Sequence, residues 1–169
     1  MSPPPIQTGV PDTTDARLAA SLKSELISLR EFVVILQNEQ DALTLGDAER
    51  LNLLLADKTR LATRLAACAN ERTRLLAALA LPVDRDGMKQ WLSRPQPDAT
   101  NLGKTWEEIL TQATRAQELN ANNGILIASR LQHNQQALNA LLAASNQAAL
   151  YGPDGQTHTG GKGRSLGSA

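Results

Sequence analysis

The stretch LKSELISLREFVVILQNEQDALTLGD, from Leu22 to Asp47, decides the fold class of this chain. Apolar residues recur in it at alternating four- and three-residue steps, which is the spacing of a seam between packed helices. The seam residues are Leu22, Leu26, Leu29, Val33, Leu36 and Leu43. Phe32 and Ile35 widen the stripe, and a wide stripe indicates packing against more than one neighbouring helix. The stretch therefore predicts an all-α bundle.

Gly46 and Asp47 interrupt this pattern and predict a short turn. Glycine readily takes the left-handed conformation that ends a helix, and aspartate can cap the helix that follows. A second apolar series continues in the same rhythm through Leu51, Leu54, Leu61, Leu65, Cys68, Leu75 and Leu79. Lys58 and Arg72 interrupt the second series, and we expect their stems to cover the seam while their charges reach water. Pro82 is expected to stop the second helix.

Proline and glycine are frequent after Pro82, which predicts a structured linker with Trp91 packed on the end of the bundle. A third helix follows, with its stripe at Trp106, Leu110, Ala113, Asn120, Ile127, Leu131, Leu138 and Leu142. Because Asn122, Asn123 and Gly124 are poor helix formers, we expect a helix that continues through a weak point. Asn120 and Asn134 either fix the register of packed helices or are exposed positions at the edge of the stripe.

The predicted architecture is an elongated antiparallel bundle of three long helices with coiled-coil-like packing, formed by residues 12–150. The expected segments are a disordered lead over residues 1–11, helices over 12–45, 47–81 and 101–149, the linker over 82–100, and a flexible tail over 151–169. At ~1.5 Å per residue the third helix is the longest, and it would pass the Gly46 turn at about residue 135. Leu138, Leu141 and Leu142 would then lack an internal partner, which favours a binding surface.

Charge and composition exclude several classes of function. Seventeen basic and seventeen acidic residues give a net charge of zero, so binding of nucleic acid by bulk charge is not expected. The single cysteine, Cys68, fits a core position in a reducing compartment, and His133 and His158 have no companions at metal-ligand spacing. We therefore expect a cytoplasmic protein that is not an enzyme and needs no cofactor. The N-terminus resembles no signal peptide, and no apolar run is long enough for a membrane span.

Three short motifs near the C-terminal end resemble the FlgN family of flagellar type III export chaperones. They are LN-x-x-NG at Leu119 to Gly124, NQQAL at Asn134 to Leu138, and LYG-x-DGQT at Leu150 to Thr157. The resemblance implies a small, helical, cytoplasmic chaperone for the hook-filament junction proteins FlgK and FlgL. It also implies that the chaperone engages the C-terminal ends of these clients and then meets the flagellar export apparatus.

The candidate site combines this resemblance with the helical pattern. We expect the client to bind an apolar stripe, defined by Ile127, Leu131, Leu138, Leu141 and Leu142. Tyr151 is the only tyrosine, lies at the end of the predicted helix, and matches a family tyrosine; we expect it to dock on the export gate. Packing of Tyr151 on Trp106 or on a leucine is the alternative. A coiled-coil adaptor that self-associates through the apolar stripe is the alternative function.

Overall fold

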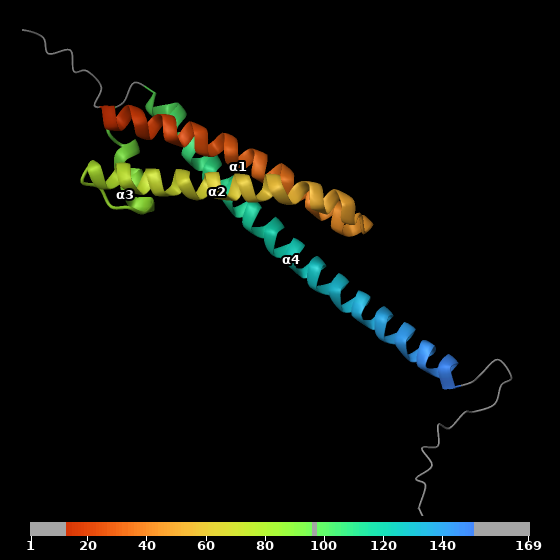
Figure 1. The fold of residues 1–169 in the computed structure, drawn as a ribbon. Coiled ribbons are helices and arrows are strands. Elements are labelled where there is room, and N and C mark those ends of the chain that lie inside the picture. Colours follow the sequence, from red (N-terminus) through yellow and green to blue (C-terminus); the bar gives the residue numbers. More distant parts are fainter. Residues whose placement is uncertain (1–12, 96–97, 151–169) are drawn as a thin grey trace, which may run out of the picture. The chain divides into compact units, whose positions relative to one another are not determined.

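A computed structural model describes residues 13–95 and 98–150, with the side chains of residues 14–95 and 98–146. Within these ranges the regular structure is helical and consists of α1 (Thr13–Leu45), α2 (Ala48–Ala78), α3 (Arg85–Leu92) and α4 (Ala99–Leu150) (Figure 1). The all-α prediction is therefore confirmed. The chain divides into two units: unit 1 ends at Leu126 and holds α1, α2, α3 and the first part of α4, and unit 2 begins at Ile127.

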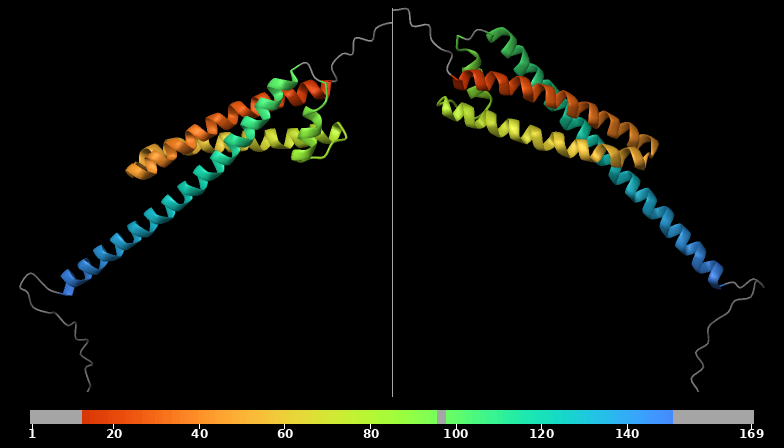
Figure 2. Two further views of the ribbon diagram at one scale, coloured as in Figure 1. Left: turned by 180° about the vertical axis from the view of Figure 1, so that it is seen from behind. Right: turned by 45° about the horizontal axis from the view of Figure 1, so that its top comes forward.

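The α1–α2 hairpin is the framework of unit 1. The two helices lie side by side in all three ribbon views (Figures 1 and 2). At the turn between them Gly46 has a φ of 78°, and the amides of Gly46 and Asp47 both donate to the carbonyl of Ala42 at 2.9 Å. The carboxylate of Asp47 accepts from the amide of Arg50 at 2.9 Å, which caps α2. The predicted turn is confirmed in both of its parts.

The helix α2 ends a few residues before the proline that was predicted to stop it. The helix ends at Ala78, before the predicted end at residue 81, and Ala80 has a left-handed φ of 55°. The amide of Leu81 donates back to the carbonyl of Leu76 at 3.0 Å, which satisfies an orphan carbonyl of the last turn. The residue before a proline is disfavoured in the helical region, so the chain leaves the helix before Leu81 is reached.

The short helix α3 lies inside the predicted linker. The prediction of three helices is therefore wrong, because the described residues form this fourth, short helix as well. Asp84 caps α3, since its carboxylate accepts from the amides of Asp86 and Gly87 at 2.9 and 3.0 Å. A Cβ at Gly87 would lie 1.7 Å from the carbonyl oxygen of Pro82, so only glycine fits there. The glycine that indicated a linker in the sequence, Gly87, is needed for another reason: its backbone approaches the backbone of Pro82 closely. Trp91 is fully buried, as predicted.

The core of unit 1 is built on the apolar seam of α1. The six predicted seam residues are all buried, which confirms the periodicity of the opening stretch. Buried residues of the other helices complete the same cluster: Leu75, Leu76, Met88, Trp91, Leu102, Trp106, Ile109 and Ala116. Three helices therefore cover α1, in agreement with the wide stripe that Phe32 and Ile35 give to it.

Lys58 and Arg72 do not simply project into water as predicted, because both form ion pairs at partly buried positions, where their side chains are 23% and 21% exposed. Arg72 forms an ion pair with Glu25 of α1, and its guanidinium lies 5.3 Å from the ring centroid of Trp106. The ammonium of Lys58 lies 2.7 Å from the carboxylate of Glu39. The side chains of Arg72 and Glu25 are only 21% and 9% exposed. Both cations stay in the interface because each finds a carboxylate on the facing helix, which compensates for lost hydration.

The buried face of α4 has a different register from the predicted one. Trp106 is buried as expected, but Ala113 and Asn120 are exposed. The buried row instead advances in steps of seven through Leu102, Ile109, Ala116 and Asn123. A seam pattern contains two such rows, and the sequence does not tell which of them continues to face the hairpin beyond Trp106. The helix is continuous through Asn122 to Gly124, as we expected.

Candidate functional site

The apolar stripe of unit 2 is exposed at every position. Ile127 is 40% exposed, and Leu131, Leu138, Leu141 and Leu142 are between 49% and 69% exposed. All described side chains from residue 127 to residue 146 are exposed. The length argument expected loss of internal partners only beyond about residue 135, but the unbroken run of exposed side chains begins at Ile127. Ile125, at 68% exposed, adds an apolar side chain just before the stripe that the periodic pattern missed.

The five side chains of the stripe share one face of α4. Their spacings of three, four and seven residues place them along a single side of the helix. Full burial of a leucine or isoleucine contributes roughly 1.5–3 kcal/mol relative to its exposed state. A partner that covers the stripe therefore gains several kilocalories per mole from apolar contact. This arrangement suits recognition of another helix with a matching apolar face.

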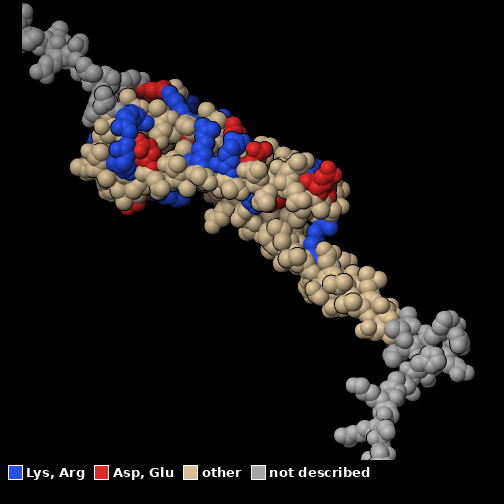
Figure 3. Space-filling view, in the orientation of Figure 1, with Lys and Arg blue, Asp and Glu red and all other residues tan. Residues whose placement is uncertain are grey.

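Charge is nearly absent from this part of α4. Between residues 127 and 146, Arg130 is the only lysine, arginine, aspartate or glutamate. In the space-filling view the charged side chains gather over α1 and α2 (Figure 3). The polar residues of the segment are mostly amides, and the amide of Gln135 donates to the side-chain oxygen of Asn139 at 3.0 Å along the helix. The segment therefore offers apolar area and amide groups to a partner rather than a charge pattern.

The other sequence candidates have different positions. Asn134 and His133 are exposed on α4. Tyr151 and His158 lie outside the described residues, so the expected docking role of Tyr151 stays a prediction. Among the residues that the structure describes, no group of three or more His, Cys, Asp or Glu side chains is arranged to hold a metal ion. In the same part of the chain no helix is long and apolar enough to cross a membrane.

Cys68 is half-buried beside an open groove of about 440 Å³ between α1 and α2. The groove is lined by Arg17, Ala20, Ser21, Ser24, Arg64, Ala67, Cys68 and Glu71. Burial raises the pKa of the Cys68 thiol, and the nearby carboxylate of Glu25 raises it further. At neutral pH the thiol is therefore protonated, which is the poorly nucleophilic form. This fits the predicted packing role better than a catalytic role.

Comparison with known proteins identifies the family. The model of the family described as FlgN protein matches residues 14–159. The chain belongs to the FlgN family. The match includes every described residue of the apolar stripe and the position of Tyr151. Membership places the chain among flagella synthesis proteins and confirms the resemblance carried by the three C-terminal motifs.

Individual FlgN relatives align over most of their length. The flagella synthesis protein FlgN of Escherichia coli K12 is 28% identical over 152 residues, covering 86% of this chain and 96% of that protein. The FlgN of Salmonella typhimurium LT2 is 31% identical over 125 residues, covering 72% and 86%. The FlgN of Yersinia enterocolitica is 27% identical over 150 residues, covering 89% and 92%.

A solved structure shares the fold of this FlgN family member. It is a crystal structure of a candidate flagella synthesis protein FlgN from Pseudomonas aeruginosa, which matches with a TM-score of 0.62 at 22% identity. The match covers 76% of this chain and 94% of the Pseudomonas chain. The helical fold is therefore shared with a relative whose sequence has diverged widely.

Proposed function

We propose that the chain is a cytoplasmic export chaperone that binds the hook-filament junction proteins FlgK and FlgL and delivers them to the flagellar type III export apparatus. The observation that carries this proposal is the apolar stripe, which no described part of the chain covers. Membership of the FlgN family supports a role in flagellar assembly. An exposed apolar stripe on a protein of this kind is a site for a partner rather than part of a core.

In this proposal the client supplies an amphipathic helix from its C-terminal end. The apolar face of the client helix covers Leu131, Leu138 and Leu142, and the amide groups around the stripe provide hydrogen bonds at its edges. Because the segment is nearly uncharged, most of the binding energy comes from apolar burial. The covered segment of the client is then hidden from other junction proteins, which prevents premature assembly in the cytoplasm.

Self-association is the alternative use of the same stripe. A coiled-coil adaptor would cover the stripe with a second copy of the chain and would need no client. Sedimentation of the chain at low micromolar concentration separates the two functions, because the chaperone is then a monomer and the adaptor a dimer. A tight dimer that no client segment dissociates would contradict the chaperone.

Titration calorimetry with the C-terminal segments of FlgK and FlgL tests the proposal directly. We expect saturable one-to-one binding to the full chain and no measurable binding to a chain that lacks residues 131–169. The deletion removes four of the five stripe residues and leaves the core of unit 1 in place. Unchanged binding by the shortened chain would place the client site on unit 1 and exclude the stripe.

Tyr151 provides a separate prediction for the export gate. An aromatic side chain at the end of a helix offers a large apolar face and one hydroxyl group, which makes it an efficient anchor for a partner. Tyr151→Ala is expected to leave FlgK and FlgL binding within about twofold and to weaken binding of the export gate by about 2 kcal/mol or more. Both affinities are measured by calorimetry on one preparation. Equal loss of the two would assign Tyr151 to the client site or to the fold.

A further inference from the structure

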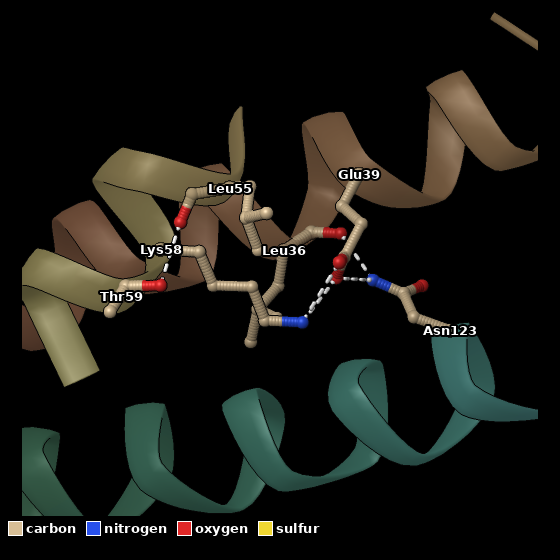
Figure 4. Close-up of polar contacts among 6 residues, drawn as sticks. All are labelled: Leu36, Glu39, Leu55, Lys58, Thr59 and Asn123. Carbon is tan, nitrogen blue, oxygen red and sulfur yellow. Dashed lines mark hydrogen bonds and ion pairs between the residues drawn. The ribbon is translucent and has the colours of Figure 1, made fainter. Parts of the chain in front are cut away.

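A buried polar cluster joins three helices of unit 1 (Figure 4). The carboxylate of Glu39 on α1 accepts from the ammonium of Lys58 on α2 at 2.7 and 2.8 Å and from the side-chain amide of Asn123 on α4 at 2.8 Å. The same amide nitrogen of Asn123 donates to the carbonyl oxygen of Leu36 at 2.9 Å. Asn123 is only 1% exposed, so this cluster lies inside the packed interface.

Within the described part of the chain, the cluster leaves one buried polar atom without a partner. The side-chain oxygen of Asn123 is buried and finds no hydrogen-bond donor among the described residues. An unsatisfied buried acceptor lowers stability, whereas an apolar residue of similar size would avoid that loss. Buried asparagines in helical interfaces are best known for fixing the register and partner of a helix at a cost in stability.

The apolar contacts of α4 do not by themselves exclude a shift along the hairpin by one helical turn. After a shift of four residues the core positions of Leu102, Trp106 and Ile109 would stay apolar, and only the position of Ala116 would receive a polar residue, Asn120. Ile127 would replace Asn123 and would be drawn into the bundle. The polar cluster opposes this exchange directly, because isoleucine offers no donor to Glu39 and Asn123 would lose both of its acceptors. Burial of Asn120 in the place of Ala116 opposes it as well.

We propose that Asn123, together with Glu39 and Lys58, fixes the register of α4 on the α1–α2 hairpin and so keeps Ile127 available on the surface. This assigns to Asn123 the register role that the sequence left open for Asn120 and Asn134. Asn123 is three residues from the end of unit 1, where a fixed register decides which residue of α4 is the first to leave the core.

Distance measurement by double electron–electron resonance tests the proposal on the full chain. Nitroxide labels are placed on Asp41→Cys of α1 and Glu107→Cys of α4, which are exposed positions of unit 1, in a Cys68→Ala background. The parent is expected to give one distance. Asn123→Leu is expected to add a second distance longer by about 5 Å, one helical turn, with a melting temperature equal to or above that of the parent.

Two further variants complete the experiment. Asn122→Leu changes an exposed asparagine of the same helix, and the residue four positions before it, Glu118, is exposed as well, so this variant is expected to keep the single distance of the parent. The triple variant Glu39→Leu, Lys58→Leu and Asn123→Leu removes every member of the cluster, so it leaves no unpaired charge if the single variant folds poorly. A single parental distance in both Asn123 variants would overturn the proposal. Loss of helical circular dichroism in both would also overturn it, since the cluster would then support the fold itself.

Discussion

Replacing Leu138 and Leu142 together by aspartate is expected to abolish binding of FlgK and FlgL segments, with a loss of more than about a hundredfold in affinity. Both side chains are about half exposed in the free chain, so the change removes little from its own core. In the complex it removes up to about 3 kcal/mol of apolar burial at each position. Titration calorimetry measures the affinity, and thermal melting followed by circular dichroism is expected to stay within a few degrees of the parent.

A matched control keeps the charge and the spacing but changes the face of the helix. Gln136→Asp with Ala140→Asp introduces two carboxylates four residues apart on the side of α4 opposite the stripe, at exposed positions. We expect this control to bind within a few fold of the parent. Equal loss in both double variants would show that charge on the helix, rather than the stripe, is responsible. A large fall in melting temperature for the leucine variant alone would make these leucines part of a core.

Trp91→Ala is expected to lower the free energy of unfolding of unit 1 by about 3–5 kcal/mol. Trp91 is fully buried, and its indole nitrogen donates to the carboxylate of Asp15 at 2.6 Å. The side chain therefore joins α3 to the first turn of α1, and the two bonded residues are 76 positions apart in the sequence. Alanine leaves a cavity and also leaves the carboxylate of Asp15 without this donor. Urea unfolding followed by circular dichroism measures the change without use of the deleted indole.

Two companion variants separate the contributions at this position. Trp91→Phe removes the hydrogen bond but keeps most of the apolar volume, so we expect it to cost less than half as much as Trp91→Ala. Val83→Ala changes a side chain near α3 that is 56% exposed, and it is expected to alter stability by less than about 0.5 kcal/mol. A cost below about 1 kcal/mol for Trp91→Ala would mean that α3 contributes little to the core.

The sequence was most informative where a helix has neighbours on a broad face. The seam of α1 was predicted residue by residue because its leucines and Val33 face other helices along the whole length of the hairpin. Gly46 and Asp47 were predicted because a left-handed φ and a capping carboxylate are local requirements. Features that depend on one residue and its chain neighbours are the ones that a single sequence reveals.

The polar contacts between helices could not be predicted in this way. Arg72 and Lys58 have the same sequence context as exposed cations, and only the facing Glu25 and Glu39 keep them in the interface. Asn123 was assigned to a weak point of the helix, since its propensity is poor and its partners lie 84 and 87 residues away. To predict such contacts, one must first know how the helices align with one another.

The candidate site was predicted through an argument about length. Comparison of helix lengths indicated that the end of the third helix lacks internal partners, and the stripe residues are exposed. The run of exposed residues begins at Ile127, earlier than the estimate of about residue 135. The estimate used only the rise per residue, which does not tell which side chains of α4 face the hairpin. Tyr151 was singled out by residue type and family motif alone, and its role stays a prediction.

The two tryptophans of the chain, Trp91 and Trp106, are both buried in unit 1, and none lies beyond Leu126. Intrinsic tryptophan fluorescence is therefore a reporter of the bundle alone, while circular dichroism sums the helix of unit 2 with the rest. Melting curves recorded by the two methods need not coincide, even when the bundle unfolds in one cooperative step. Their difference isolates the fraying of the exposed helix, and a client that orders this helix would bring the curves together.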